Sequence, residues 1–149
     1  MIIKELTKQA SLDILARSRL GRLACAKANQ PYIVPIFFAH HERSLYCIST
    51  VGRKIEWMRE NPLVAVEVDE IRSAQHWASI QVFGRYEELA DTPETKDLRH
   101  LAWSLLQTHE LWWQPGYVET VVGGAKRPMV PLYFRIHIDE ITGHGATEE

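Results

Sequence analysis

Hydrophobic and polar residues alternate along much of the chain, which is typical of half-buried β-strands. The pattern predicts strands over residues 20–27, 32–40, 45–49, 63–69, 77–89 and 132–139. In the longest of these, Ile80, Val82 and Tyr86 fall on one face, while Ser79 and Gln81 fall on the other. Pro35 lies inside the second strand and cannot donate to a ladder, so we expect an edge or a bulge there.

Three segments instead have helical periodicity. Residues 7–19 and 52–60 predict short helices, with Thr7 or Ser11 as the cap of the first. Thr92, Pro93 and Glu94 form a helix start, followed by apolar residues at helical spacing: Leu98, Leu101, Ala102, Leu105 and Leu106.

The order of elements predicts a mainly β fold with short flanking helices. Six antiparallel strands in a chain of this length suit a small closed barrel, which removes exposed edges. A β-sandwich is the competing architecture. We expect one domain over residues 1–143 and a loose tail over 144–149.

Composition excludes some classes of protein. The 149 residues include 17 Lys and Arg against 19 Asp and Glu, a net charge of −2, which disfavours a nucleic-acid module held by bulk charge. No apolar run approaches the ~20 residues needed to cross a bilayer, and no secretory signal is expected. Cys25 and Cys47 lie in apolar surroundings, so we expect reduced thiols and a cytoplasmic location.

The strongest local signal is the segment Ser49-Thr50-Val51-Gly52-Arg53-Lys54, which joins a strand to a helix. The N-terminal end of a helix is already positive, so two cations there are unfavourable unless an anion also binds. Free backbone N–H groups, hydroxyls and cations together suit a phosphate. The alternative is that Arg53 and Lys54 are solvated surface residues.

Other chemistry has weaker support in the sequence. The seven histidines form no metal-binding motif, so no metal is expected. Trp112, Trp113 and Tyr117 are flat apolar side chains that either wall a ligand ring or cover a core edge. No residue stands out as an obligatory catalytic acid or base, although His40 could donate a proton.

Several segments, in this order and spacing, resemble the pyridoxamine 5′-phosphate oxidase-like flavoproteins. They are residues 20–24, 31–38, 45–54, 61–68, 82–89 and 135–143. The nearest branch resembles the 5-nitroimidazole reductase-like proteins. The resemblance covers nearly the whole chain from Gly21 to Gly143, but nothing is carried over for the segment from Trp112 to Met129.

This resemblance implies a six-stranded split β-barrel and a homodimer that binds FMN at the subunit interface. It places the FMN phosphate at Arg53 and Lys54. The further residues that it implies around the flavin are Ile48, Ser49 and Thr50 along the ribityl chain, Pro35 and Ile36 through their backbone, and Ser79.

The function expected from the resemblance is that of an oxidoreductase. It would pass electrons from a reduced nicotinamide or flavin to a small electrophile such as a nitroaromatic or a quinone. The arginine-rich substrate motif of true pyridoxamine phosphate oxidases is missing, so vitamin B6 oxidation is not expected. The alternatives are a deazaflavin-dependent reductase and a non-enzymatic flavin or haem carrier or sensor, with His137 or His144 as candidate haem ligands.

Overall fold

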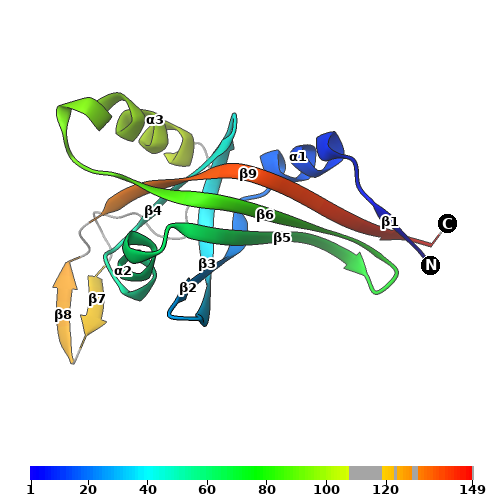
Figure 1. The fold of residues 1–149 in the computed structure, drawn as a ribbon, viewed down its shortest axis with the longest axis horizontal. Helices are drawn as coiled ribbons and strands as arrows, with labels where there is room; N and C mark the ends of the chain where they lie inside the picture. The colour runs from blue at the N-terminus through cyan, green and yellow to red at the C-terminus, as the bar shows by residue number, and fades with distance from the viewer. Residues whose placement is uncertain (108–118, 123, 129–130, 149) are drawn as a thin grey trace.

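The computed structural model describes residues 1–107, 119–122, 124–128 and 131–148, and its centre is a closed ring of antiparallel strands (Figure 1). The strand order is β9-β4-β3-β2-β5-β6, and β6 pairs with β9 to close the ring. The six ring strands are β2 (Leu20–Lys27), β3 (Gln30–His41), β4 (Ser44–Ser49), β5 (Leu63–Ser73), β6 (His76–Leu89) and β9 (Leu132–Thr147). The predicted six-stranded barrel is confirmed, and its closure excludes an open sandwich.

The remaining strands were not predicted. Strand β1 (Ile2–Glu5) pairs with the last residues of β9, from His144 to Thr147. Strands β7 (Glu119–Val122) and β8 (Ala125–Pro128) form a separate hairpin. The expected boundary at residue 143 is therefore corrected: residues 144–147 belong to β9, held between β1 and β6.

The interior of the barrel is the main hydrophobic core. Inward-facing side chains alternate along each strand, as Leu23 and Cys25 do in β2. Helix α1 (Lys8–Arg17) adds Ile14 and Leu15 to this core, and helix α2 (Arg53–Glu60) adds its own buried side chains. The largest fully buried side chains include Phe38, Phe134, Leu45, Ile80 and Met58.

A second core lies between β4 and helix α3 (Lys96–Gln107), which follows a short 3₁₀ turn at Pro93–Thr95. Ala102 and Leu106 of α3 pack with Tyr46 and Ile48 of β4. Because β4 is covered on both faces, all six of its residues are buried. This fixes the position of the segment that follows it, which leads into α2.

Two local predictions are confirmed. Thr7 caps α1, since its hydroxyl accepts a hydrogen bond from the backbone N–H of Ala10 at 3.1 Å. Pro35 lies in the part of β3 that pairs only with β2, because pairing with β4 begins at Phe38. Pro35 therefore lies at a sheet edge, where the ladder does not require a backbone N–H from this residue.

Candidate functional site

The segment between β4 and α2 leads into an open helix start. Gly52 is the N-cap, has extended backbone and provides no side-chain cap, so the first N–H groups of α2 have no side-chain acceptor at that position. A Cβ atom at Gly52 would meet no heavy atom within 4 Å. The space in front of this helix end is therefore open to a ligand.

Lys54 is the most informative residue of this site. Its side chain is half-buried, and burial is the main reason why the pKa of its ammonium lies below the usual value. The thiols of Cys47 and Cys25 lie near it and act in the opposite direction. Among the described residues, no hydrogen bond or ion pair compensates the ammonium, so an anion beside it would stabilise the charge.

Arg53 is held by an aromatic side chain. Its guanidinium lies 5.5 Å from the centroid of the Tyr32 ring, a cation–π contact. Tyr32 in turn packs against Trp57, with ring centroids 5.4 Å apart. These contacts orient an exposed guanidinium beside the helix start. Tyr32 and Trp57 were not among the predicted site residues, although Trp57 follows Arg53 at helical spacing.

The other predicted residues come from β4 and β3. Ile48 and Ser49 are buried at the end of β4, and the Ser49 hydroxyl donates to the backbone oxygen of Thr50 at 3.2 Å. On β3, Pro35 is exposed, whereas the Ile36 side chain is buried in the barrel. The contact between Arg53 and Tyr32 joins this strand to the helix start.

Ser79 lies elsewhere, on the face of β6 that points away from the barrel. Its hydroxyl donates to Glu67 at 3.2 Å and accepts from Gln81 at 2.6 Å. Arg22 and Asp69 approach to 3.9 Å in the same region. Burial and the neighbouring Asp69 carboxyl raise the pKa of Glu67. Neither hydrogen-bond partner of the Ser79 hydroxyl lies on α2 of the same chain.

This polar cluster is surrounded by exposed apolar side chains. Leu20, Ile33, Leu63 and Phe83 are 40%, 63%, 64% and 49% exposed, respectively. Strand alternation places them on the same side of β2, β3, β5 and β6 as Arg22, Glu67 and Gln81. We refer to these residues, with Asp69 and Ser79, as the outer sheet face.

The histidines considered in the sequence analysis have other partners. His40 contacts the backbone oxygen of Glu42 at 2.6 Å, and burial is the main reason why its pKa is lowered. His137 contacts Glu87 at 2.7 Å, and Glu87 also binds Arg135. His144 pairs in register with Ser79. Within the described part of the chain, no group of three or more His, Cys, Asp or Glu side chains could hold a metal ion.

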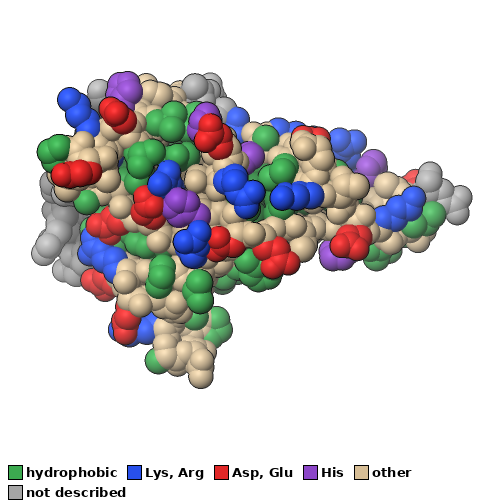
Figure 2. Space-filling model, turned by 45° about the horizontal axis from the view of Figure 1, so that its top comes forward, with side chains coloured by type: hydrophobic (Ala, Val, Ile, Leu, Met, Phe, Trp, Pro, Cys, Tyr) green, Lys and Arg blue, Asp and Glu red, His purple; other side chains and the backbone are tan. Residues whose placement is uncertain are grey.

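Figure 2 shows acidic, basic and histidine side chains interspersed on one face of the molecule, without an extended area of a single charge. Trp112, Trp113 and Tyr117, which were considered as a wall for a ligand ring, lie outside the described residues. None of the described helices has the length and apolar character needed to cross a membrane.

The family model described as pyridoxamine 5′-phosphate oxidase matches residues 7–145, so the chain belongs to that family. The fold and the family agree with the resemblance found in the sequence. The crystal structure of an FAD-binding protein (mll6688) from Mesorhizobium loti is 41% identical, covers 99% of this chain and 100% of that chain, and has a TM-score of 0.82.

Two further relatives extend this comparison. The uncharacterised protein RA0666 of Rhizobium meliloti (strain 1021) is 39% identical over 146 residues, which is 98% of this chain and 97% of that protein. A suspected 5-nitroimidazole antibiotic resistance protein from Bacteroides thetaiotaomicron is 19% identical, with a TM-score of 0.68 over 98% of this chain and 91% of that chain. At this identity, the last similarity shows a shared fold.

Proposed function

We propose that this protein binds FMN with the phosphate at the start of α2. The observation that carries the proposal is the half-buried Lys54 ammonium, which has no acidic partner among the described residues and lies beside an open helix end. A phosphate monoester would accept from the free N–H groups of the helix and compensate the charges of Lys54 and Arg53. The FAD-binding description of the Mesorhizobium loti relative supports a flavin as the ligand.

We further propose that the protein is an oxidoreductase acting on a small electrophile such as a nitroaromatic or a quinone. When bound, the flavin supplies the redox chemistry, accepting electrons from a reduced nicotinamide or a reduced flavin. The chain's own residues bind the phosphate, orient the ligand and exclude water. Tyr32 fixes Arg53 for the first of these tasks, and the edge of β3 around Pro35 offers backbone groups beside the site.

A homodimer is the third part of this proposal. The exposed apolar residues of the outer sheet face surround a partly buried polar cluster, as a polar pocket within an interface would require. Neither hydrogen-bond partner of the Ser79 hydroxyl lies on α2 of its own chain, and in a dimer Ser79 could reach the flavin from the second subunit. This arrangement would explain how residues from separate parts of the barrel act on one ligand.

Identification of the co-purified cofactor tests the ligand. The protein is denatured, and the released molecule is identified by mass spectrometry, with FMN expected. FAD, a deazaflavin or haem would each contradict the FMN assignment. Calorimetric titration of the apoprotein with FMN, FAD and riboflavin provides the second measurement, and FMN should bind most tightly.

Anaerobic stopped-flow reduction tests the activity. Reduced nicotinamide or reduced free flavin should bleach the flavin absorbance of the holoprotein, and a nitroaromatic or quinone should restore it. If neither donor reduces the bound flavin, the enzyme proposal fails, and a carrier or sensor function takes its place.

A further inference from the structure

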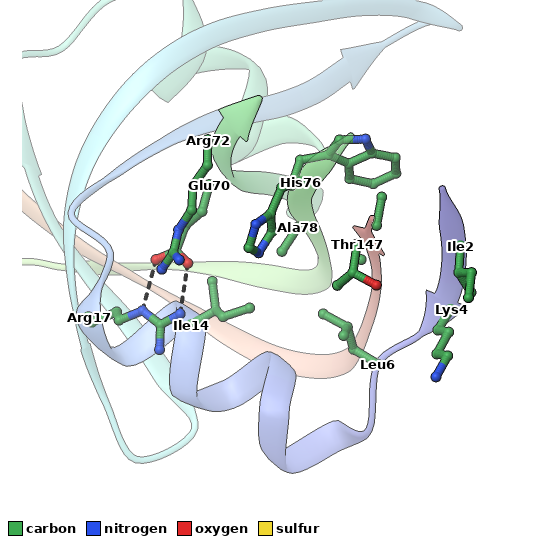
Figure 3. Close-up of a pocket in the computed structure, with 13 residues that line it drawn as sticks. Ile2, Lys4, Leu6, Ile14, Arg17, Glu70, Arg72, His76, Ala78 and Thr147 are labelled. Carbon is green, nitrogen blue, oxygen red and sulfur yellow. Dashed lines mark hydrogen bonds and ion pairs between the residues drawn. The ribbon is translucent and has the colours of Figure 1, made fainter. Parts of the chain in front are cut away.

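A cavity of about 260 Å³ lies far from the start of α2. It is formed where β1, α1 and the end of β9 meet the hairpin between β5 and β6 (Figure 3). Figure 1 shows α2 near one end of the molecule and β1 with this hairpin at the other. None of the residues proposed above to bind flavin lines this cavity.

The cavity also lies on the opposite side of the sheet from Ser79. Ala78, which lines it, precedes Ser79 in β6 and therefore faces the other way. Ile80, on the same face as Ala78, is fully buried in the barrel core. The cavity thus continues the core side of the sheet beyond the closed barrel, and the outer sheet face is separate from it.

Small residues leave the interior of this cavity open. Ala78, Gly145 and Ala146 form part of its wall. Leu6, just before α1, and Ile14, within α1, add apolar surface. A Cβ atom at Gly145 would lie 3.2 Å from the Leu6 side chain, so glycine at this position lets Leu6 pack closely over β9. A ligand entering here would meet an apolar wall.

The rim is charged, and cations predominate. Arg17 forms two hydrogen bonds with the Glu70 carboxylate, at 2.8 and 2.7 Å, and these bonds lower the pKa of Glu70 (Figure 3). Arg72 and Lys4 also line the cavity, and neither forms an ion pair with any of the described residues, although Arg72 lies near enough to Glu70 to help lower the pKa of that carboxyl. The rim therefore has positive charge available to an anion.

We propose that this cavity binds a small carboxylate with an apolar body, such as an aromatic or short aliphatic acid. The apolar part would pack against Leu6, Ile14 and Ala78, and the carboxylate would accept hydrogen bonds from Arg72. A single negative charge is favoured over a phosphate dianion because the ionised Glu70 lies on the same rim. The size of the cavity favours a molecule with one ring.

Benzoate is a suitable probe, with benzamide as its uncharged analogue. Titration of the full-length holoprotein, followed by calorimetry and by amide NMR shifts, should show saturable benzoate binding with shifts at Ala78 and Gly145. Benzamide should bind at least tenfold more weakly. Equal binding of the two, no saturation, or displacement of the flavin by benzoate would overturn the proposal.

Two variants locate the site. Arg72→Met should weaken benzoate binding about tenfold, since it removes one charge-assisted hydrogen bond at a partly solvated position. Ala78→Leu should fill the cavity and abolish binding. Arg85→Met is the matched control, because Arg85 is an exposed arginine paired with Asp139 away from the cavity. Flavin content should be unchanged in Arg72→Met. The assignment would be refuted if Arg85→Met lost as much benzoate affinity as Arg72→Met.

Discussion

At the scale of single residues, Lys54 shows how burial and function are connected. A half-buried ammonium without an acidic partner among the described residues is costly to the folded protein, and a bound phosphate would compensate that cost. Lys54→Met retains most of the apolar stem but removes the charge. We expect it to weaken FMN binding about ten- to a hundredfold, because a charge-assisted hydrogen bond contributes roughly 1.5–3 kcal/mol. Calorimetric titration of the apoprotein measures the loss.

Riboflavin is the control for this variant because it lacks the phosphate. Its affinity should change little in Lys54→Met. Arg53→Met should show the same selectivity with a smaller loss, since Arg53 is exposed and its charge is screened by water. Equal losses for FMN and riboflavin would show that the phosphate lies elsewhere.

The pH dependence of FMN affinity provides a second test at Lys54. The pKa of the ammonium is lowered in the free protein, so the lysine loses its charge at a lower pH than an ordinary lysine. Phosphate favours the charged form. FMN affinity should therefore be highest between about pH 6, above which the phosphate is a dianion, and the lowered lysine pKa, and should fall as the pH rises through that pKa. In Lys54→Met this fall in affinity at alkaline pH should disappear. The expectation would be contradicted if the affinity of the unmodified protein stayed constant up to the pKa of an ordinary lysine.

Ser11 is a second buried polar group that has no partner among the described residues. Its hydroxyl is inaccessible to solvent and forms no hydrogen bond with the described residues. Ser11→Ala should raise the free energy of unfolding by about 1 kcal/mol, since an unsatisfied buried hydroxyl is costly and alanine favours a helix. Urea denaturation measures the change.

Ser18 supplies the matched control at the end of the same helix. Its hydroxyl donates to the backbone oxygen of Ile14 at 2.6 Å, so Ser18→Ala should destabilise the protein. If the two substitutions lowered stability equally, Ser11 would have a partner in solution.

At the scale of elements, the contact between β6 and β9 determines whether the barrel can close. The pairing register shifts between Phe83 and Gly84. A Cβ atom at Gly84 would overlap the backbone oxygen of His137, which cannot move without breaking the ladder. Gly84→Ala should therefore destabilise the protein by about 3 kcal/mol or prevent folding.

Gly52→Ala is the comparison for this prediction. It makes the same chemical change at a position with no heavy atom near the added Cβ. Its effect on the midpoint of thermal unfolding should be small. Similar stabilities for Gly84→Ala and Gly52→Ala would show that β6 and β9 can separate locally to admit the side chain.

The sequence predicts most of the ring strands because each has one face in the core and one outside. Strand β1 has no such signal, since all four of its residues are exposed. The end of β9 contains Gly143 and Gly145, which disfavour a strand, yet a Cβ atom at either position would crowd Leu6. Only the three-dimensional packing shows why glycine is needed there.

The candidate site also combines residues that local sequence predicts with residues that only the fold brings together. Arg53 and Lys54 were predicted because they are adjacent in the sequence at the start of a helix, where two cations are unfavourable. The cluster of Arg22, Glu67 and Ser79 comes from three strands, and its assembly depends on pairing register. Local patterns do not contain that register, so most of the cluster was missed.

At the scale of the whole molecule, the outer sheet face is left without a cover by the described residues of the chain. Helix α3 covers β4, and α1 and α2 contribute to the core of the barrel, but Ile33, Leu63 and Phe83 remain exposed beside the helices that the structure describes. An exposed apolar surface around a polar cluster is what an interface between two copies would use. It would also bring Ser79 of one subunit toward a ligand held by the other.

The double substitution Ile33→Glu and Phe83→Glu tests this interface. Both side chains are exposed in the single chain, so the barrel should fold normally, while two charges per subunit should prevent association. Sedimentation should show a dimer for the unmodified protein and a monomer for the variant. Because the flavin would lose the second subunit, riboflavin and FMN affinities should fall together, unlike the selective loss in Lys54→Met. Trp103→Glu, on the exposed side of α3, is the control and should remain dimeric with full flavin content. An unmodified protein that is monomeric with stoichiometric flavin would refute the dimer and would require Ser79 to act apart from the cofactor.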